Sequence, residues 1–264
     1  MVFEKPSLRT RVSFETGMTQ LGGHAIYLAP SDIGLGKRES IGDTAKVISS
    51  MANVIMARTF SHETVEKLAC FSTVPVINGL SDLEHPCQIL ADVMTIWEMK
   101  GALKGLYIAY VGDGENNVTH SLCLIAGILG MNFSYASPKK FEMDEFILNK
   151  AKQYALKTGS DLVEANDPII AVKNADVVVT DTWVSMGDES EKEKRLKVFK
   201  KYQVNKKLMS YAKRDAIFLH CLPAYRGYEV TSDVIDGSQS MVFEEAENRL
   251  HVQKALLIYL LEKG

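Results

Sequence analysis

The chain has 264 residues, 46% of them hydrophobic and 24% charged, and its formal net charge at pH 7 is −3. These values are typical of a globular protein of about two domains, and they show no basic excess of the kind that nucleic acids or anionic membranes attract. No apolar run approaches the roughly 20 residues of a membrane span and no signal peptide is visible, so we expect a cytoplasmic protein. Four scattered cysteines without metal-ligand spacing predict free thiols and no metal site.

The first segment predicts a strand that leads into an anion-binding helix start. Val2 and Phe3 have the character of a strand end, Pro6 marks a turn, and the sequence Ser-Leu-Arg-Thr at 7–10 begins an amphipathic helix. Free backbone N–H groups and the helix dipole favour negative charge at such a start. Because a strand end is unexpected at a terminus, we also expect a missing upstream segment, which could include a targeting sequence.

Short β-rich runs alternate with longer helical patterns along the rest of the chain. Strands are expected at 54–56, 74–77, 106–111, 133–136, 177–180 and 217–220. Helices are expected at 11–21, 41–51, 62–70, 85–99, 121–129, 143–158, 189–211 and 246–262. This alternation predicts an α/β protein with two doubly wound parallel-sheet domains. Glycines at 101 and 105 place the boundary near Lys100, so the expected domains are 1–100 and 101–245, with a C-terminal helix at 246–264 packing back on the first domain.

Polar clusters directly follow four of the predicted strands. They are ARTF (57–60), GDGENN (112–117), DTWVSMG (181–187) and HCLPAYRG (220–227). Ligands of open α/β sheets bind outside the carboxyl ends of the strands. We therefore expect the clusters to line an active site in a cleft between the two domains.

In the first domain, the polar residues suit a phosphate that carries a carbonyl group. Arg9 and Arg58 offer guanidinium groups to phosphate oxygens. His85 and Gln88 are three residues apart on one helix face, from which both could contact a carbonyl or an amide. The alternative is that both arginines form surface ion pairs and that His85 caps its helix.

In the second domain, the polar residues suit a small amino-acid ligand. Asn117 occupies the position of the third glycine in a GxGxxG loop, which disfavours a nicotinamide dehydrogenase and leaves either a ligand contact or a turn. Asp181 and Ser185 offer a carboxylate and a hydroxyl to an ammonium group. Cys221 is either a site residue or a buried structural thiol. Arg249 either adds a guanidinium to the phosphate site or pairs at a helix start.

Taken together, five segments resemble the ornithine carbamoyltransferases, in order, at suitable spacing and over essentially the whole chain. The segments are FEKPSLRTR, HPCQ, DTWVSMG, HCLPAYRG and FEEAENRLHVQ. Two features depart from the family: Leu8 stands where many members have threonine, and members carry about forty or more residues before this start.

The resemblance implies transfer of the carbamoyl group of carbamoyl phosphate to the δ-amine of L-ornithine, without a cofactor. It implies that carbamoyl phosphate is bound by Ser7, Leu8, Arg9, Thr10, Arg58, His85, Gln88, Cys221, Leu222 and Arg249. It implies that ornithine is bound by Asn117, Asp181, Ser185 and Met186, and that the catalytic residues are Arg58, His85, Asp181 and Cys221. It further implies a homotrimer or a multiple of trimers, in which a loop near 33–40 reaches the neighbouring site.

Several other functions stay open at this point. Aspartate carbamoyltransferases share the phosphate half but lack the DxxxSMG and HCLPxxRG pair. Carbamoyltransferases that act on acylated ornithine or putrescine are nearer alternatives. An impaired protein that only binds ligand is the alternative from a different class.

Overall fold

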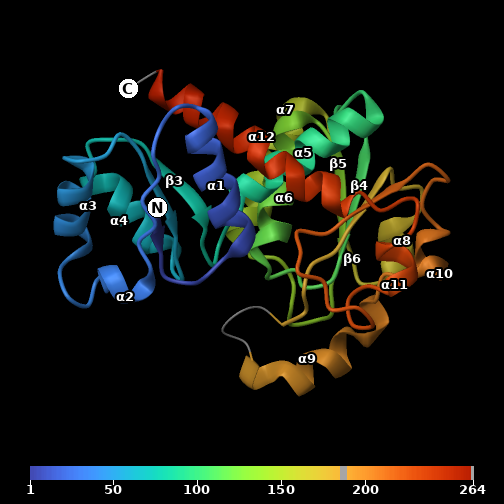
Figure 1. Ribbon diagram of the computed structural model, residues 1–264. Coiled ribbons are helices and arrows are strands. Elements are labelled where there is room, and N and C mark those ends of the chain that lie inside the picture. The colour runs from blue at the N-terminus through green and yellow to red at the C-terminus, as the bar shows by residue number, and fades with distance from the viewer. Residues whose placement is uncertain (185–188, 263–264) are drawn as a thin grey trace. The chain divides into compact units, whose positions relative to one another are not determined.

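The computed structural model describes residues 1–184 and 189–262, and these fall into two compact α/β units (Figure 1). Unit 1 comprises Met1–Ala91 and Glu247–Gly264, and unit 2 comprises Asp92–Ala246. Two helices, α5 (Pro86–Lys100) and α12 (Val242–Leu261), contribute residues to both units.

Unit 1 is built on a parallel three-stranded sheet in the order β1-β2-β3. Its strands are β1 (Val2–Phe3), β2 (Ile55–Arg58) and β3 (Val76–Leu80), and its other helices are α1 (Leu8–Gln20), α2 (Pro30–Ile33), α3 (Ile41–Ser49) and α4 (His62–Phe71). Successive residues of a strand point to opposite faces, so the two faces have separate cores. Phe3 and Met56 pack with residues of α1, α5 and α12. Val2 and Ile55 pack with residues of α2, α3 and α4.

Unit 2 is built on a parallel five-stranded sheet in the order β6-β5-β4-β7-β8. Its strands are β4 (Tyr107–Val111), β5 (Asn132–Ala136), β6 (Leu162–Ala165), β7 (Val177–Val179) and β8 (Ile217–Leu219). Its helices are α6 (Asn117–Leu129), α7 (Glu145–Thr158), α8 (Pro168–Val172), α9 (Lys192–Phe199), α10 (Lys206–Met209) and α11 (Ser232–Ile235), with 3₁₀ turns η1 (Glu189–Glu191) and η2 (Lys200–Tyr202). Both sheets are parallel, which confirms the predicted fold class.

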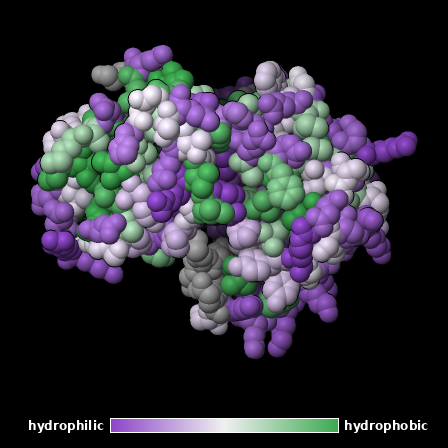
Figure 2. Space-filling view, in the orientation of Figure 1, coloured by the Kyte–Doolittle hydropathy of each residue, from purple (hydrophilic) through white to green (hydrophobic). Residues whose placement is uncertain are grey.

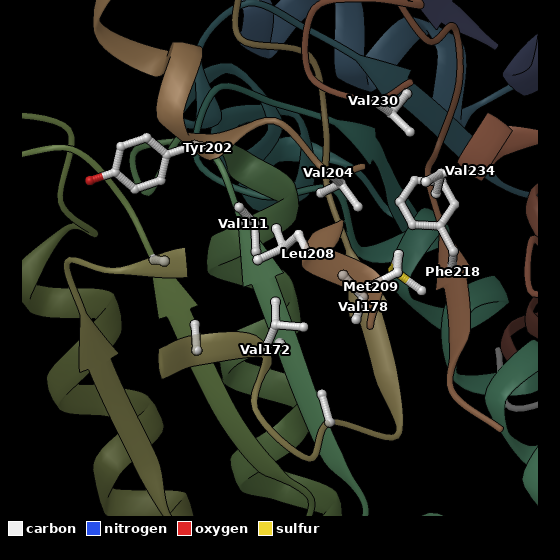
Figure 3. Packing of buried hydrophobic residues seen from close by; sticks show 14 of the residues in the cluster. Val111, Val172, Val178, Tyr202, Val204, Leu208, Met209, Phe218, Val230 and Val234 are labelled. Carbon is white, nitrogen blue, oxygen red and sulfur yellow. The ribbon is translucent and has the colours of Figure 1, made fainter. Parts of the chain in front are cut away.

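The main core of unit 2 joins the central strands to segments from the last third of the unit. Val111 and Val178 from β4 and β7 pack in one cluster with Phe218 from β8, and all three are almost fully buried (Figure 3). Leu208 and Met209 from α10 belong to the same cluster. Burying a side chain of this size contributes about 1.5–3 kcal/mol, so this cluster is a substantial contribution to the stability of unit 2.

The strand order places a switch point between β4 and β7. From β4 the chain proceeds outward to β5 and β6, and it then returns to β7 on the other side of β4 and continues to β8. At such a point the connections leave two neighbouring strands in opposite directions, and a crevice opens beyond their carboxyl ends. The loops after β4 and β7 are therefore the expected ligand site of unit 2.

All six predicted strands are present within a few residues of their expected positions, and one further strand, β6, was missed. β6 is an edge strand whose Val163 is 40% exposed, so it lacks the continuous apolar run that marks the central strands. The prediction of one helical stretch over 189–211 is wrong. The backbone of Val204 bonds to Glu229 and Thr231 (Val204 N to Glu229 O 2.8 Å, Thr231 N to Val204 O 3.0 Å), and this pairing separates η2 from α10.

The surface is mixed in character. Figure 2 shows hydrophilic side chains that project at the bottom of the view, where the lysine-rich helix α9 lies. Within the part of the chain that the structure describes, every helix is too short or too polar for a membrane span.

Candidate active site

The start of α1 and the beginning of α12 meet at a group of cationic and hydroxyl side chains in unit 1. Ser7 is the N-cap of α1, and its Oγ accepts the Thr10 N–H at 3.3 Å. Thr10 Oγ1 accepts hydrogen bonds from Ser7 Oγ at 3.0 Å and from Arg249 Nη2 at 2.8 Å. We call Ser7, Arg9, Thr10, Arg58, His85, Gln88 and Arg249 the anion half-site.

The anion half-site is mostly buried, which is unusual for cations. Arg58 at the end of β2 is 6% exposed and Arg249 is 2% exposed. His85 and Gln88 are buried as well, and Arg9 is half-buried. Several positive charges lie together in this buried place, and the field that they create favours an anionic ligand. The Leu8 side chain is 74% exposed, which leaves its backbone N–H as the group that could serve such a ligand.

The pKa of His85 is lowered in part by the same positive charges. Burial lowers the pKa of this imidazole well below 6.5, and Arg249, Arg58, Arg9 and Lys5 lower it further. A neutral imidazole can donate a hydrogen bond to a carbonyl oxygen without competing with the guanidinium groups for the anion.

Lys5 is a further cation of this region and was not among the predicted site residues. Its side chain is 8% exposed, and Nζ lies 4.8 Å from the centroid of the Phe60 ring. The signal was available, because Lys5 stands within the segment FEKPSLRTR two residues before the α1 N-cap.

In unit 2, a carboxylate, an amide and a thiol meet at the switch point. Asp181 follows β7, and its Oδ1 accepts a hydrogen bond from Cys221 Sγ at 3.1 Å. Its Oδ2 accepts a hydrogen bond from Asn116 Nδ2 at 2.9 Å. We call Asn116, Asn117, Asp181, Cys221 and Leu222 the carboxylate half-site. Asn117, the first residue of α6, is half-buried.

The loop that carries Cys221 is held by a buried histidine and a buried glutamate. His220 Nδ1 accepts the Leu222 N–H at 2.9 Å, and His220 Nε2 lies 3.1 Å from Glu229 Oε1. Glu229 Oε1 also accepts the Tyr225 N–H at 2.5 Å. Leu222 has φ 55°, which is uncommon for a residue other than glycine, and its bond to His220 holds that conformation.

Cys221 is a protonated thiol in this environment. Burial raises its pKa well above 9.0, and the negative charges of Asp181, Glu245 and Asp92 act in the same direction. Burial and Asp181 also raise the pKa of Tyr110 well above 10.0. Cys221 is therefore a hydrogen-bond donor to Asp181 near neutral pH and not a thiolate base or nucleophile.

Asp181, His220 and Cys221 offer three donor atoms within 4.8 Å of one another, which is near enough for a shared metal ion to be considered. The contacts of these residues do not favour one. Both ring nitrogens of His220 are engaged, with Leu222 and with Glu229, and the Cys221 thiol proton points to Asp181.

The structure thus brings the predicted residues into two groups, one in each unit. Ser185 and Met186, predicted to bind ornithine, lie outside the described residues. Asn116 was not among the predicted site residues, whereas its neighbour Asn117 was. The signal for Asn116 was an asparagine just before a helix pattern, where a cap is expected.

Two family models match the chain, and they meet near residue 100; residues 247–260, which belong to unit 1, fall within the second model. Residues 1–98 match the family model described as "Aspartate/ornithine carbamoyltransferase, carbamoyl-P binding domain". Residues 104–260 match the model described as "Aspartate/ornithine carbamoyltransferase, Asp/Orn binding domain".

Individual relatives are similar over almost all of the chain. An ornithine carbamoyltransferase of Anoxybacillus flavithermus is 56% identical over 261 residues, which are 99% of this chain and 83% of the relative. One of Bacillus subtilis is 56% identical over 264 residues, 100% of this chain and 82% of the relative.

Solved structures give the same result. The structure of ornithine carbamoyltransferase from Pyrococcus furiosus superposes with a TM-score of 0.96 at 54% identity, covering 99% of this chain and 83% of that one. The structure of an anabolic ornithine carbamoyltransferase from Campylobacter jejuni has a TM-score of 0.96 at 45% identity, with 100% and 87% covered. The chain therefore belongs to the aspartate/ornithine carbamoyltransferase family.

Proposed function

We propose that this chain is an ornithine carbamoyltransferase, which converts carbamoyl phosphate and L-ornithine to L-citrulline and phosphate in arginine metabolism. The observation that carries the proposal is the contrast between its two half-sites. One is a buried cation group with a neutral imidazole, and the other is a carboxylate that accepts hydrogen bonds from an amide and a thiol. The first suits an acyl phosphate and the second suits an amine.

The anion half-site supports a role for Arg9, the start of α1 and Arg249 in binding the phosphate. Ser7, Leu8 and Thr10 would offer backbone N–H groups and hydroxyls there. Arg58, His85 and Gln88 would donate to the carbamoyl group, whose oxygen gains negative charge when the amine attacks. Each such donor in a preorganised site contributes a few kcal/mol to the stability of the transition state. The C–O bond to phosphate then breaks, and phosphate leaves as the anion that the arginines already hold.

The carboxylate half-site supports a role for Asp181 in orienting the acceptor. We propose that Asn117 and Asp181 bind ornithine, together with Ser185 and Met186. The attacking δ-amine must be neutral, and the proton that it loses as the new C–N bond forms passes to the departing phosphate. Because Cys221 is itself protonated, we assign it to holding Asp181 and, with Leu222, to contact with the carbamoyl group.

The test is citrulline formation from carbamoyl phosphate and L-ornithine, with aspartate, an acylated ornithine and putrescine as rival acceptors. We expect ornithine to be preferred over each rival. The family includes both aspartate and ornithine carbamoyltransferases, so the acceptor panel separates these activities. Carbamoyl phosphate binding without citrulline formation would reject the ornithine assignment.

We also propose a homotrimer or a multiple of trimers, with the loop near 33–40 reaching a neighbouring site, and a cytoplasmic location. In unit 1 this loop follows α2, and Leu35 pairs with Glu39 in an isolated bridge. Sedimentation equilibrium measures the number of subunits, and a monomer would reject this part of the proposal.

A further inference from the structure

The Asp181 carboxylate is hydrogen-bonded to Asn116, which lies in the segment between β4 and α6. Its Oδ2 accepts a hydrogen bond from Asn116 Nδ2 at 2.9 Å, and Asn116 is 6% exposed. We propose that Asn116 is a positioning residue, which holds Asp181 in the orientation that the acceptor amine requires without itself touching the substrate. This inference rests on the proposed function and deepens it.

The backbone decides which way the Asn116 amide points. Asn116 is the N-cap of α6, and its Oδ1 accepts the Val118 N–H at 2.7 Å. A backbone N–H can only donate, so the amide oxygen must face Val118 and the amide nitrogen must face Asp181. One side chain therefore caps a helix and orients a carboxylate in the neighbouring loop.

The two oxygens of Asp181 have different partners, and this defines the plane of the carboxylate. Cys221 Sγ donates to Oδ1 at 3.1 Å, whereas Asn116 Nδ2 donates to Oδ2 at 2.9 Å. These partners come from the loops after β8 and β4, on either side of β7. Among the described residues, loss of the Asn116 donor leaves Cys221 as the hydrogen-bond partner of the carboxylate, which can then rotate about its last torsion.

The segment that carries Asn116 is itself anchored. The Asn116 N–H donates to Asp113 O at 3.3 Å, and the Glu115 N–H donates to Asp113 Oδ1 at 3.1 Å. Arg195 Nη1 donates to Asp113 Oδ2 at 2.6 Å from a largely buried position. Asn116 therefore approaches Asp181 from a fixed backbone, as a positioning residue must.

Capping α6 and donating a hydrogen bond to Asp181 use different atoms of the Asn116 side chain, so substitutions can separate these two roles. Asparagine, aspartate and serine are similarly good N-caps, so N116D and N116S both keep the cap of α6. Neither keeps the amide donor. N116S removes it, and N116D places a second carboxylate against Asp181, where like charges repel. A capping role alone predicts near wild-type activity for both variants, whereas positioning predicts loss in the order N116D, then N116S, then wild type.

The experiment measures kcat and KM for ornithine, together with the dissociation constant of carbamoyl phosphate by calorimetry. We expect kcat/KM for ornithine to fall about 10- to 100-fold in N116S and further in N116D, because displacing a reacting group by about 1 Å can cost 10²-fold. We expect carbamoyl phosphate affinity to change by less than about twofold, since its main ligands lie in unit 1. N205S is the matched control, because Asn205 caps α10 through the Leu208 N–H at 3.0 Å.

The outcomes separate the two proposals. Equal kcat/KM values for wild type, N116S and N116D would overturn the positioning role and leave the proposed function intact. A matching loss in N205S, or a parallel loss of carbamoyl phosphate affinity, would also overturn it, because a cap defect would then account for the effect. Wild-type protein that forms no citrulline would overturn the proposed function itself. If N116S fails to fold, N116D decides, since aspartate caps a helix about as well as asparagine does.

Discussion

The pKa of His85 reflects the positive charges of the whole anion half-site. The imidazole is buried, and four cationic side chains lower its pKa further below 6.5. A histidine with so low a pKa stays neutral through the physiological pH range. A neutral ring can donate a hydrogen bond to a carbonyl oxygen without adding another positive charge to a group of cations.

This environment predicts a specific dependence of stability on pH. In the unfolded chain His85 binds a proton below about pH 6.5, whereas in the folded chain it does not, so the free energy of unfolding falls as pH falls. We expect H85Q to lose this part of the slope in denaturant titrations between pH 7.5 and 5.5 in buffers free of phosphate.

The control for this prediction is H24Q, which removes an exposed histidine. H24Q should keep the wild-type slope. Equal slopes for H85Q and wild type would show that the folded chain protonates His85 after all.

Cys221 makes the second prediction at the residue scale. Burial, Asp181, Glu245 and Asp92 raise its pKa well above 9.0, and only the thiolate reacts with iodoacetamide. At pH 7.5 we expect alkylation of Cys221 to be at least about tenfold slower than alkylation of the exposed Cys70. Peptide mass spectrometry follows each site, and C70S should remove the fast phase. Labelling of Cys221 at the rate of Cys70 would contradict a protonated, shielded thiol.

At the scale of elements, helix α6 is placed by close contact with α7. A Cβ at Gly127 would lie 2.7 Å from Ala151 O and 3.3 Å from Ala155 N, both backbone atoms of α7. The helices can come this close only because residue 127 has no side chain. Since α6 begins at the Asn116 cap, its position also sets that of the carboxylate half-site.

Two glycine substitutions should therefore have opposite signs. G127A would force α6 from α7 and should destabilise the protein by about 1–3 kcal/mol. In G17A the nearest atom is Lys254 Cγ at 3.2 Å, the stem of a flexible side chain. Alanine is favoured over glycine in a helix by about 1 kcal/mol, so G17A should be neutral or stabilising. Thermal unfolding of both variants measures the difference, and destabilisation of equal size would refute the backbone argument.

At the scale of the molecule, each unit holds one chemically distinct half of the proposed machinery. The cations belong to unit 1, and the Asp181 carboxylate belongs to unit 2. Ligand binding should therefore respond to each half separately.

We expect R58A to weaken carbamoyl phosphate binding about 10- to 100-fold, since a hydrogen bond to a charged group contributes about 1.5–3 kcal/mol. We expect D181N to leave this affinity within about threefold and to lower ornithine turnover sharply. Isothermal titration of each variant with carbamoyl phosphate checks this, with R214A as the control for an exposed arginine. The reverse pattern would invalidate the assignment of ligands to units.

By itself, the sequence determined the fold class, most of the strands and the identity of the chemical groups. The alternation of short apolar runs with helical patterns depends only on residues that are close in the sequence, so it is recognisable from the sequence alone. The five family-like segments determined the family in the same way. Missed or wrong elements were those with weak local signals, such as the exposed edge strand β6 and the 189–211 stretch that Val204 divides.

Only the tertiary structure decided which of these groups meet. Asn116 and Asp181 are 65 residues apart, and they are hydrogen-bonded because β7 returns to pair with β4. The low pKa of His85 and the high pKa of Cys221 arise from burial and from charges on distant segments. Sequence patterns describe what each residue can do, whereas desolvation and Coulomb energy depend on distances across the fold, which only packing sets.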